Sequence, residues 1–179
     1  RGKVPSVALV GYTNAGKSSL LNALTGSETF VENKLFATLD PLTKKLPLNE
    51  SAGALITDTV GFVSNLPHHL IDAFKSTLEE AVTADLLLLV LDSSDVEAEF
   101  QYKTVCDVLE EIGATKNTRL ILLNKIDKND DSTQTLSALR LKFPEAICIS
   151  AKEEIGFVEL KDKIYELLYG ELANYVIPT

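Results

Sequence analysis

Five short, nearly continuous apolar runs are spaced along the chain, at residues 7–10, 55–57, 86–91, 120–123 and 147–149. Runs of this kind are typical of strands that are buried on both faces of a parallel sheet. Residues 44–49 form a sixth candidate strand, in which Pro47 lacks an amide donor and therefore favours an edge position. The short connection 50–53 predicts an antiparallel hairpin between this strand and the one at 55–57.

Amphipathic helices are predicted between the strands. Apolar residues recur at helical spacing in residues 18–24, 66–82, 98–112 and 160–168, and in a shorter segment that begins near Ser132 and ends before Pro144. Ser94-Asp95-Val96-Glu97 precedes the helix at 98–112 and is a candidate capping box. This alternation predicts an α/β fold: a mostly parallel six-stranded sheet with helices on both faces and one antiparallel edge strand. Ligands bind such sheets beyond the carboxyl ends of the strands.

A phosphate-binding motif follows the first predicted strand. Its sequence is Gly11-Tyr12-Thr13-Asn14-Ala15-Gly16-Lys17-Ser18, which matches GxxxxGK[ST] at every fixed position, and Ser19 continues it into a helix. The glycines permit backbone conformations that a β-carbon would block, so successive amides can point at phosphate oxygens. Lys17 is predicted to reach the β- and γ-phosphates, and Ser18 is predicted to ligate Mg²⁺. A glycine-bearing turn without a ligand is the alternative, and the order of strand, loop and helix disfavours it.

A second element of a nucleotide site is Asp58-Thr59-Val60-Gly61, which follows the run at 55–57. Asp58 is predicted to hold Mg²⁺ through water, as the acidic partner of Ser18. The amide of Gly61 can approach a γ-phosphate, and a glycine there lets the next segment move when that phosphate leaves. An acidic residue at a strand end can also cap a helix, but the upstream phosphate loop makes that interpretation the poorer one.

Two further segments favour guanine over adenine. Asn124-Lys125-Ile126-Asp127 follows the run at 120–123, and Ser150-Ala151-Lys152 follows the run at 147–149. The Asp127 carboxylate can accept hydrogen bonds from both N1–H and the amino group of guanine, whereas adenine has no proton on N1. Asn124 is predicted to brace the loop and hold the base from its other edge. The Lys125 stem is predicted to lie along the ring, and the Ala151 amide to donate to O6 of the base.

Composition and charge exclude several other classes of protein. The chain has 179 residues, 45% of them hydrophobic and 24% charged, which predicts one globular domain spanning residues 1–179. Seventeen basic and 26 acidic residues give a net charge of −9, so no direct DNA binding is expected. The longest apolar run, 86–91, is far shorter than the roughly 18 residues of a membrane-spanning helix, so no membrane partner is expected. Two cysteines without a CxxC pattern favour a reducing, cytoplasmic location.

The ordered motifs GYTNAGKS, DTVG, NKID and SAK resemble those of the translation-factor-related GTPases. The segment 35–41, Phe62 after DTVG, and Leu66-Pro67 before a helix containing residues 77–80 narrow the resemblance to the HflX family. The resemblance implies a P-loop NTPase G domain that binds GTP or GDP with Mg²⁺ and hydrolyses GTP. It also implies that Thr38 contacts Mg²⁺ and the γ-phosphate, and that the full-length protein acts at the large ribosomal subunit. HflX-like proteins carry an additional N-terminal domain, which agrees with a sequence that starts at Arg1 and contains no methionine.

Two positions bear on the rate of hydrolysis. Phe62 occupies the place after DxxG where Ras-type proteins have a glutamine that orients the attacking water. Slow intrinsic hydrolysis is therefore expected, with Lys17, Thr38 and Gly61 acting through positioning and charge. Asn14 stands where potassium-activated relatives place an asparagine, and the hypothesis is that K⁺ bound there supplies positive charge. The alternatives are a nucleotide-gated binding switch with negligible hydrolysis, a phosphoryl-transfer kinase, and a GTPase domain of a membrane transporter.

Overall fold

One six-stranded sheet forms the centre of the fold in the computed structural model, which describes residues 3–26, 42–59, 61, 78–79, 81–128 and 134–176. The strands are β1 (Ser6–Gly11), β2 (Leu42–Pro47), β3 (Gly53–Asp58), β4 (Leu86–Asp92), β5 (Thr118–Asn124) and β6 (Ile147–Cys148). Their order in the sheet is β2-β3-β1-β4-β5-β6, and only the β2–β3 pair is antiparallel among these strands. The predicted fold class, hairpin and edge strand are confirmed.

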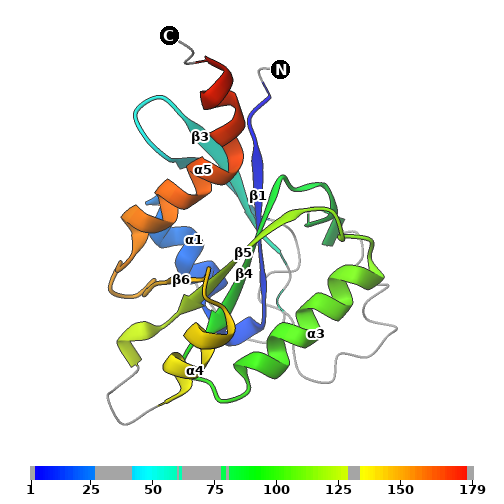
Figure 1. Ribbon diagram of the computed structural model, residues 1–179, viewed down its shortest axis with the longest axis vertical. Coiled ribbons are helices and arrows are strands. Elements are labelled where there is room, and N and C mark those ends of the chain that lie inside the picture. The colour runs from blue at the N-terminus through cyan, green and yellow to red at the C-terminus, as the bar shows by residue number, and fades with distance from the viewer. Residues whose placement is uncertain are drawn as a thin grey trace.

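Helices cover both faces of the sheet, as predicted. They are α1 (Lys17–Thr25), α3 (Ala98–Glu111), α4 (Thr135–Lys142) and α5 (Phe157–Val176), with short 3₁₀ turns η1 (Thr13–Ala15) and η2 (Ile126–Lys128). In Figure 1, α1 and α5 lie on one side of the sheet and α3 lies on the other. Residues 78–79 and 81–83 are helical, and the rest of the helix predicted at 66–82 lies outside the described residues. None of the helices in the described ranges is long and apolar enough to span a bilayer.

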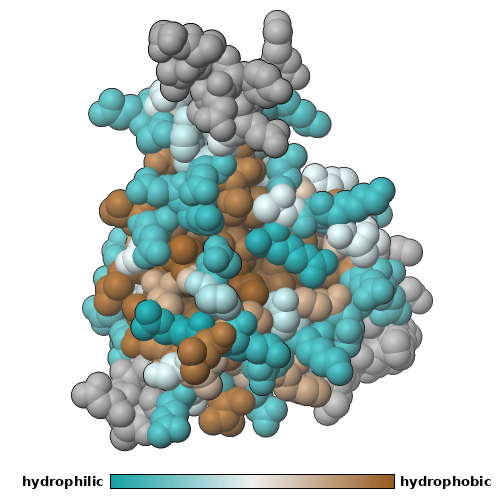
Figure 2. All heavy atoms as spheres, viewed as in Figure 1, coloured by the Kyte–Doolittle hydropathy of each residue, from teal (hydrophilic) through white to brown (hydrophobic). Residues whose placement is uncertain are grey.

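The apolar side chains of each strand alternate between two buried layers. In β4, Leu86, Leu88 and Val90 pack with α1 and α5, whereas Leu87 and Leu89 pack with α3. Successive side chains of a strand point to opposite faces, so a strand between two helical layers must be apolar throughout. This is why the continuous apolar runs predicted the strands. Hydrophobic residues also remain on the surface, scattered among hydrophilic ones (Figure 2).

The start of α3 differs from the predicted capping box. The Ser94 hydroxyl donates to Asp92 Oδ1 at 2.6 Å, outside the helix, so Ser94 does not cap it. Glu97 holds the N-cap position, and its side chain makes no capping hydrogen bond. The Asp95 carboxylate lies just before the helix, where its Oδ1 accepts the Glu97 amide at 2.8 Å and its Oδ2 accepts the Gln101 side-chain amide at 3.1 Å. The prediction was wrong because the Asp92 carboxylate, at the end of β4, competes for the serine hydroxyl.

Tyr12 turns its side chain into the core beneath the phosphate loop. The residue is 7% exposed and packs in the cluster that includes Val10, Leu78 and Leu109. Its buried hydroxyl has no hydrogen-bond partner among the described residues. The ring is therefore part of the apolar layer that packs with α3. A buried hydroxyl without a partner costs free energy, because it loses its hydrogen bonds to water.

We predict that Tyr12→Phe raises the free energy of unfolding by about 1 kcal/mol, since it removes only that hydroxyl. Thr59→Val is the control, because the buried Thr59 hydroxyl donates to the Leu9 carbonyl at 2.6 Å. The control should lose about 1 kcal/mol or more of stability. Urea unfolding measures both. A loss of stability in Tyr12→Phe as large as that in Thr59→Val would show that the tyrosine hydroxyl has a partner after all.

Candidate functional site

The polar residues predicted to form the site gather at the carboxyl edge of the sheet. Asp58 ends β3 and Asn124 ends β5, the phosphate loop follows β1, and Ser150 comes two residues after β6. The polar residues extend the strands beyond the predicted apolar runs, because backbone pairing continues through them: Asp58 pairs with Leu9 in the ladder and Asn124 with Asp92. Parallel strands end at the same edge, so residues far apart in sequence are neighbours here.

The phosphate loop consists of the η1 turn, Gly16 and the first turn of α1. Gly16 has φ +94°, in the left-handed region that favours glycine. A β-carbon built there would lie 2.5 Å from Nδ2 of Asn124. Glycine is therefore needed both for the backbone turn and for the close approach of Asn124. The loop ends at the amino terminus of α1, where backbone amides without helical partners favour an anion.

A buried ion pair lies beside this loop. The Lys17 ammonium is 3.0 Å from Asp58 Oδ1 and donates to the Thr59 carbonyl at 3.1 Å. The two charged side chains are 4% and 2% exposed, and buried charges are stable only when paired in this way. The Ser18 hydroxyl donates to Asp58 Oδ2 at 2.8 Å. One carboxylate therefore joins the lysine and the serine of the phosphate loop.

Gly61 lies directly against the phosphate loop. A β-carbon at this position would be 2.8 Å from Cγ2 and 3.0 Å from Cα of Thr13. Thr59, two residues before Gly61, is fixed to β1, since its hydroxyl and its amide both donate to the Leu9 carbonyl. Gly61 thus lies next to the phosphate loop, and the approach of its amide to a γ-phosphate stays a prediction. Thr38 and Phe62 lie outside the described residues.

The predicted base-binding residues form a connected second part of the site. Asn124 is 1% exposed; its Nδ2 donates to the Ala15 carbonyl at 2.8 Å, and its Oδ1 accepts the Ala151 amide at 3.0 Å. The Ser150 hydroxyl donates to Asp127 Oδ1 at 2.7 Å, which orients an otherwise exposed carboxylate. Asn124 thus ties the phosphate loop to the loop after β6, the bracing role predicted for it.

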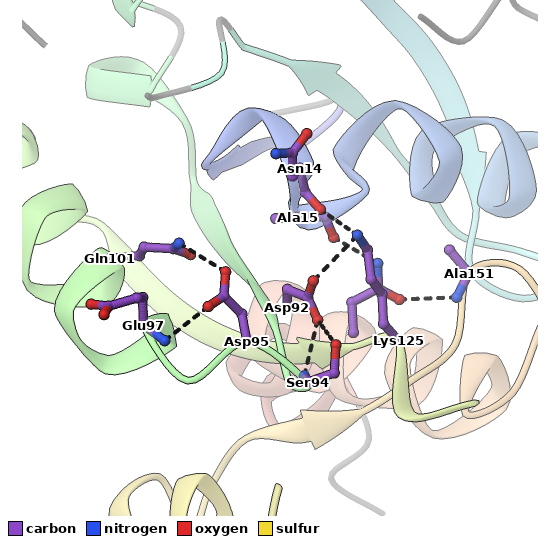
Figure 3. A network of polar contacts seen from close by, with 10 residues as sticks. Asn14, Ala15, Asp92, Ser94, Asp95, Glu97, Gln101, Lys125 and Ala151 are labelled. Carbon is purple, nitrogen blue, oxygen red and sulfur yellow. Dashed lines mark hydrogen bonds and ion pairs between the residues drawn. The ribbon is translucent and has the colours of Figure 1, made fainter. Parts of the chain in front are cut away.

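The remaining predicted residues lie around these two parts. Lys152 is exposed, as is Asn14, and Ser19 is half-buried in the first turn of α1. Figure 3 shows the Lys125 side chain between Asn14 and Asp92. The Lys125 ammonium donates a hydrogen bond to the Asn14 carbonyl oxygen and forms an ion pair with Asp92. The Asn14 side-chain amide points away from Lys125 (Figure 3).

Asp92 is a residue of the site that the motifs did not indicate. Its Oδ2 lies 3.3 Å from the Lys125 ammonium. Its position is the only feature of the sequence that points to it: it is the first polar residue after the apolar run of β4, and the neighbouring strand ends at Asn124. This position predicts that Asp92 lies at the carboxyl edge of the sheet, but it does not predict that Asp92 contacts Lys125.

The donor set beside the phosphate loop suits Mg²⁺. Ser18 offers a hydroxyl oxygen and Asp58 a carboxylate, within 2.8 Å of each other. Mg²⁺ takes oxygen ligands, and in nucleotide sites it binds one or two protein groups together with phosphates and waters. These two residues therefore fit the ion.

Comparison with known proteins agrees with this geometry. A family model described as "50S ribosome-binding GTPase" matches residues 6–125. The chain is 47% identical over 180 residues to GTPase HflX of Caldanaerobacter subterraneus subsp. tengcongensis, covering 99% of this chain and 40% of that protein. It is 51% identical over 172 residues to GTPase HflX of Lacrimispora saccharolytica, covering 96% and 40%. The chain thus spans about two fifths of the length of these relatives.

A solved structure shows the same fold with a nucleotide. It is a GTP-binding protein from the hyperthermophilic archaeon Sulfolobus solfataricus in complex with GDP, with TM-score 0.69 and 34% identity, covering 91% of this chain and 52% of that one. The family match spans the phosphate loop, Asp58, Gly61 and the first residues of the Asn124 motif. The chain therefore belongs to the 50S ribosome-binding GTPase family, as its HflX-like motifs predict.

Proposed function

We propose that this chain is the GTP-binding domain of a longer, ribosome-associated GTPase of HflX type, which hydrolyses GTP to GDP and phosphate. The observation that carries the proposal is the double hydrogen bond of Asn124, with Ala15 in the phosphate loop and Ala151 in the loop after β6. A nucleotide has a phosphate end and a base end at a fixed separation. The buried Asn124 side chain joins the phosphate loop, which suits the phosphate end, to the loop after β6, which suits the base end. The site is therefore suited to a nucleotide.

The phosphate end is assigned to Lys17, Ser18 and the loop amides, with Thr38 and Gly61 completing it. Lys17 contributes a positive charge that is held close to the loop by Asp58. Ser18, Asp58 and Thr38 are the proposed protein ligands of Mg²⁺, which would neutralise negative charge on the phosphates when bound. The adjacency of Ser18 and Asp58 supports this assignment.

The base end is assigned to Asn124, Lys125 and Asp127, with Ser150, Ala151 and Lys152 from the loop after β6. Ser150 holds Oδ1 of the Asp127 carboxylate, so that the group has a fixed orientation towards a base. Two hydrogen bonds from N1–H and the amino group would then select guanine, because adenine would leave a carboxylate oxygen without a partner. The Lys125 aliphatic stem lies near Gly16, which suits it to contact the flat side of the nucleotide.

Catalysis in this proposal comes from position and charge. Lys17, Thr38 and Gly61 would hold the γ-phosphate and stabilise the charge that develops during transfer to water. Phe62 cannot orient that water by hydrogen bonding, so intrinsic hydrolysis would be slow and a partner would accelerate it.

The partner proposed for the full-length protein is the large ribosomal subunit, and the proposed location is the cytoplasm. The family description and the names of the relatives support this assignment. The net charge of −9 indicates that residues 1–179 are not the main RNA-binding surface. The regions of the relatives that this chain does not cover are the proposed source of that surface.

Asp127→Asn tests the base assignment. The change replaces a double acceptor with an amide that has one acceptor, so GDP affinity should fall by about 100-fold or more, while xanthosine diphosphate should bind more tightly. Isothermal titration with both nucleotides measures the preference. Asp162→Asn, the same change at an exposed position on α5, is the control and should bind GDP normally. Unchanged GDP affinity in Asp127→Asn would show that guanine is recognised elsewhere.

Phosphate release under multiple turnover tests hydrolysis and the partner together. The intact protein should release phosphate slowly alone and about 10-fold or more faster with large ribosomal subunits, since an added partner can supply positioning and charge. Lys17→Ala is the control and should remove the activity in both conditions. Nucleotide-dependent subunit binding without any stimulated release would instead identify a binding switch with negligible hydrolysis.

Potassium is the proposed source of additional positive charge near Asn14. The residue is exposed in the phosphate loop, and its side-chain amide is turned away from Lys125 (Figure 3). Hydrolysis should be several-fold faster in KCl than in NaCl of equal ionic strength, and Asn14→Ala should remove the difference. Equal rates of the wild-type protein in the two salts would exclude a role for K⁺.

A further inference from the structure

Asp92 occupies a junction between three parts of the molecule. It ends β4, stands opposite Asn124 in the parallel β4–β5 ladder, and begins the turn that leads to α3. The Ser93 amide donates to the Asn124 carbonyl at 2.9 Å, which keeps this junction next to the base-binding segment. Asp92 belongs to none of the motifs that define the proposed nucleotide site.

The two oxygens of the Asp92 carboxylate have different partners. Oδ1 accepts the Ser94 amide at 2.9 Å and the Ser94 hydroxyl at 2.6 Å, a local turn of the kind that aspartate and asparagine both form. Oδ2 lies 3.3 Å from the Lys125 ammonium. The turn thus fixes the orientation of the carboxylate, and the second oxygen is left directed at the lysine (Figure 3).

Lys125 is held at both its backbone and its ammonium. Its backbone has φ +66°, an uncommon conformation for a residue with a side chain. The ammonium donates to the Asn14 carbonyl and pairs with Asp92, and the side chains of the pair are 23% and 16% exposed. A lysine side chain has four rotatable bonds, so a second, charged anchor reduces the number of conformers it adopts.

We propose that Asp92 is a positioning residue for nucleotide binding: it holds the Lys125 ammonium on the Asn14 carbonyl. This contact joins the phosphate loop to the base-binding segment at a second point, beside the contact that Asn124 makes with Ala15. The inference rests on the proposed function, because it assigns Asp92 to the same nucleotide site.

The consequence is a nucleotide that dissociates slowly. GDP would contact both segments at once, so it leaves readily only when one segment moves away from the other. Loss of the carboxylate charge should let Lys125 sample more conformers, and the Asn14 contact is then made for a smaller fraction of the time. The effect should be the same for GDP and GTP, because Asp92 acts at the junction and not at the γ-phosphate.

Asp92→Asn removes the charge and retains the Oδ1 acceptor for Ser94. GDP should bind about 10-fold more weakly, mostly through faster dissociation, as expected for a partly exposed charged hydrogen bond. The rate of phosphate release should fall more at subsaturating GTP than at saturating GTP, because the loss is in nucleotide binding. Stopped-flow dissociation of a fluorescent GDP analogue measures the first quantity. Asp92→Glu restores the charge and should bind GDP more tightly than Asp92→Asn.

Ser94→Ala is the matched control. It removes the hydroxyl contact at 2.6 Å but leaves the Ser94 amide, the Asp92 charge and the Lys125 pair in place. GDP dissociation should therefore be nearly unchanged in this variant. A dissociation rate raised as much in Ser94→Ala as in Asp92→Asn would assign the effect to the turn and overturn the proposal.

A double-mutant cycle with Lys125→Met separates positioning through the lysine from general damage. In the Lys125→Met background, Asp92→Asn should change GDP dissociation by less than about twofold, because its target is already gone. Additive effects of the two substitutions on GDP dissociation would overturn the positioning role alone. The same holds if GDP dissociates from Asp92→Asn at the wild-type rate. A folded wild-type chain that binds no guanine nucleotide would overturn both this inference and the proposed function.

Discussion

The organisation of the site depends on one buried amide side chain. Asn124 is almost fully shielded from water, so its donor and its acceptor must both be satisfied within the protein. They are satisfied by the Ala15 carbonyl and the Ala151 amide, which belong to loops that follow the first and the last strands in the chain. The cost of leaving either group without a partner keeps the two loops at a fixed separation. Gly16 permits this approach, because any side chain there would collide with Asn124.

The charges of the site are arranged as pairs at the ends of apolar strands. Lys17 pairs with Asp58 at the end of β3, and Lys125 pairs with Asp92 at the end of β4. Each lysine also donates to a backbone carbonyl, of Thr59 and of Asn14 respectively. A chain with a net charge of −9 can therefore present local positive charge together with the backbone amides of the α1 terminus. Affinity for phosphate depends on this local arrangement and not on the net charge.

Most of the fold could be predicted because strands buried on both faces must be apolar throughout, and helices between them must be apolar on one side. The boundaries were less predictable: Asp58, Asp92 and Asn124 remain in the backbone ladder although their polarity ends the apolar runs. The capping box predicted before α3 is absent, because the hydroxyl of Ser94 bonds to Asp92 and the residue at the N-cap position is Glu97. Spacing alone does not show whether a serine hydroxyl bonds to a helix amide or to a neighbouring carboxylate.

The motifs were recognisable from the amino-acid sequence: a glycine-bearing phosphate loop, Asp58 and Gly61 after a buried strand, and the Asn124 and Ser150 segments after two others. Each motif is local, so short-range spacing was sufficient to recognise it. Two features could not be recognised in this way: the Tyr12 ring faces the core, and Asp92 reaches Lys125. These contacts depend on which strands are neighbours and on the direction of each side chain, and both follow from packing across the whole sheet.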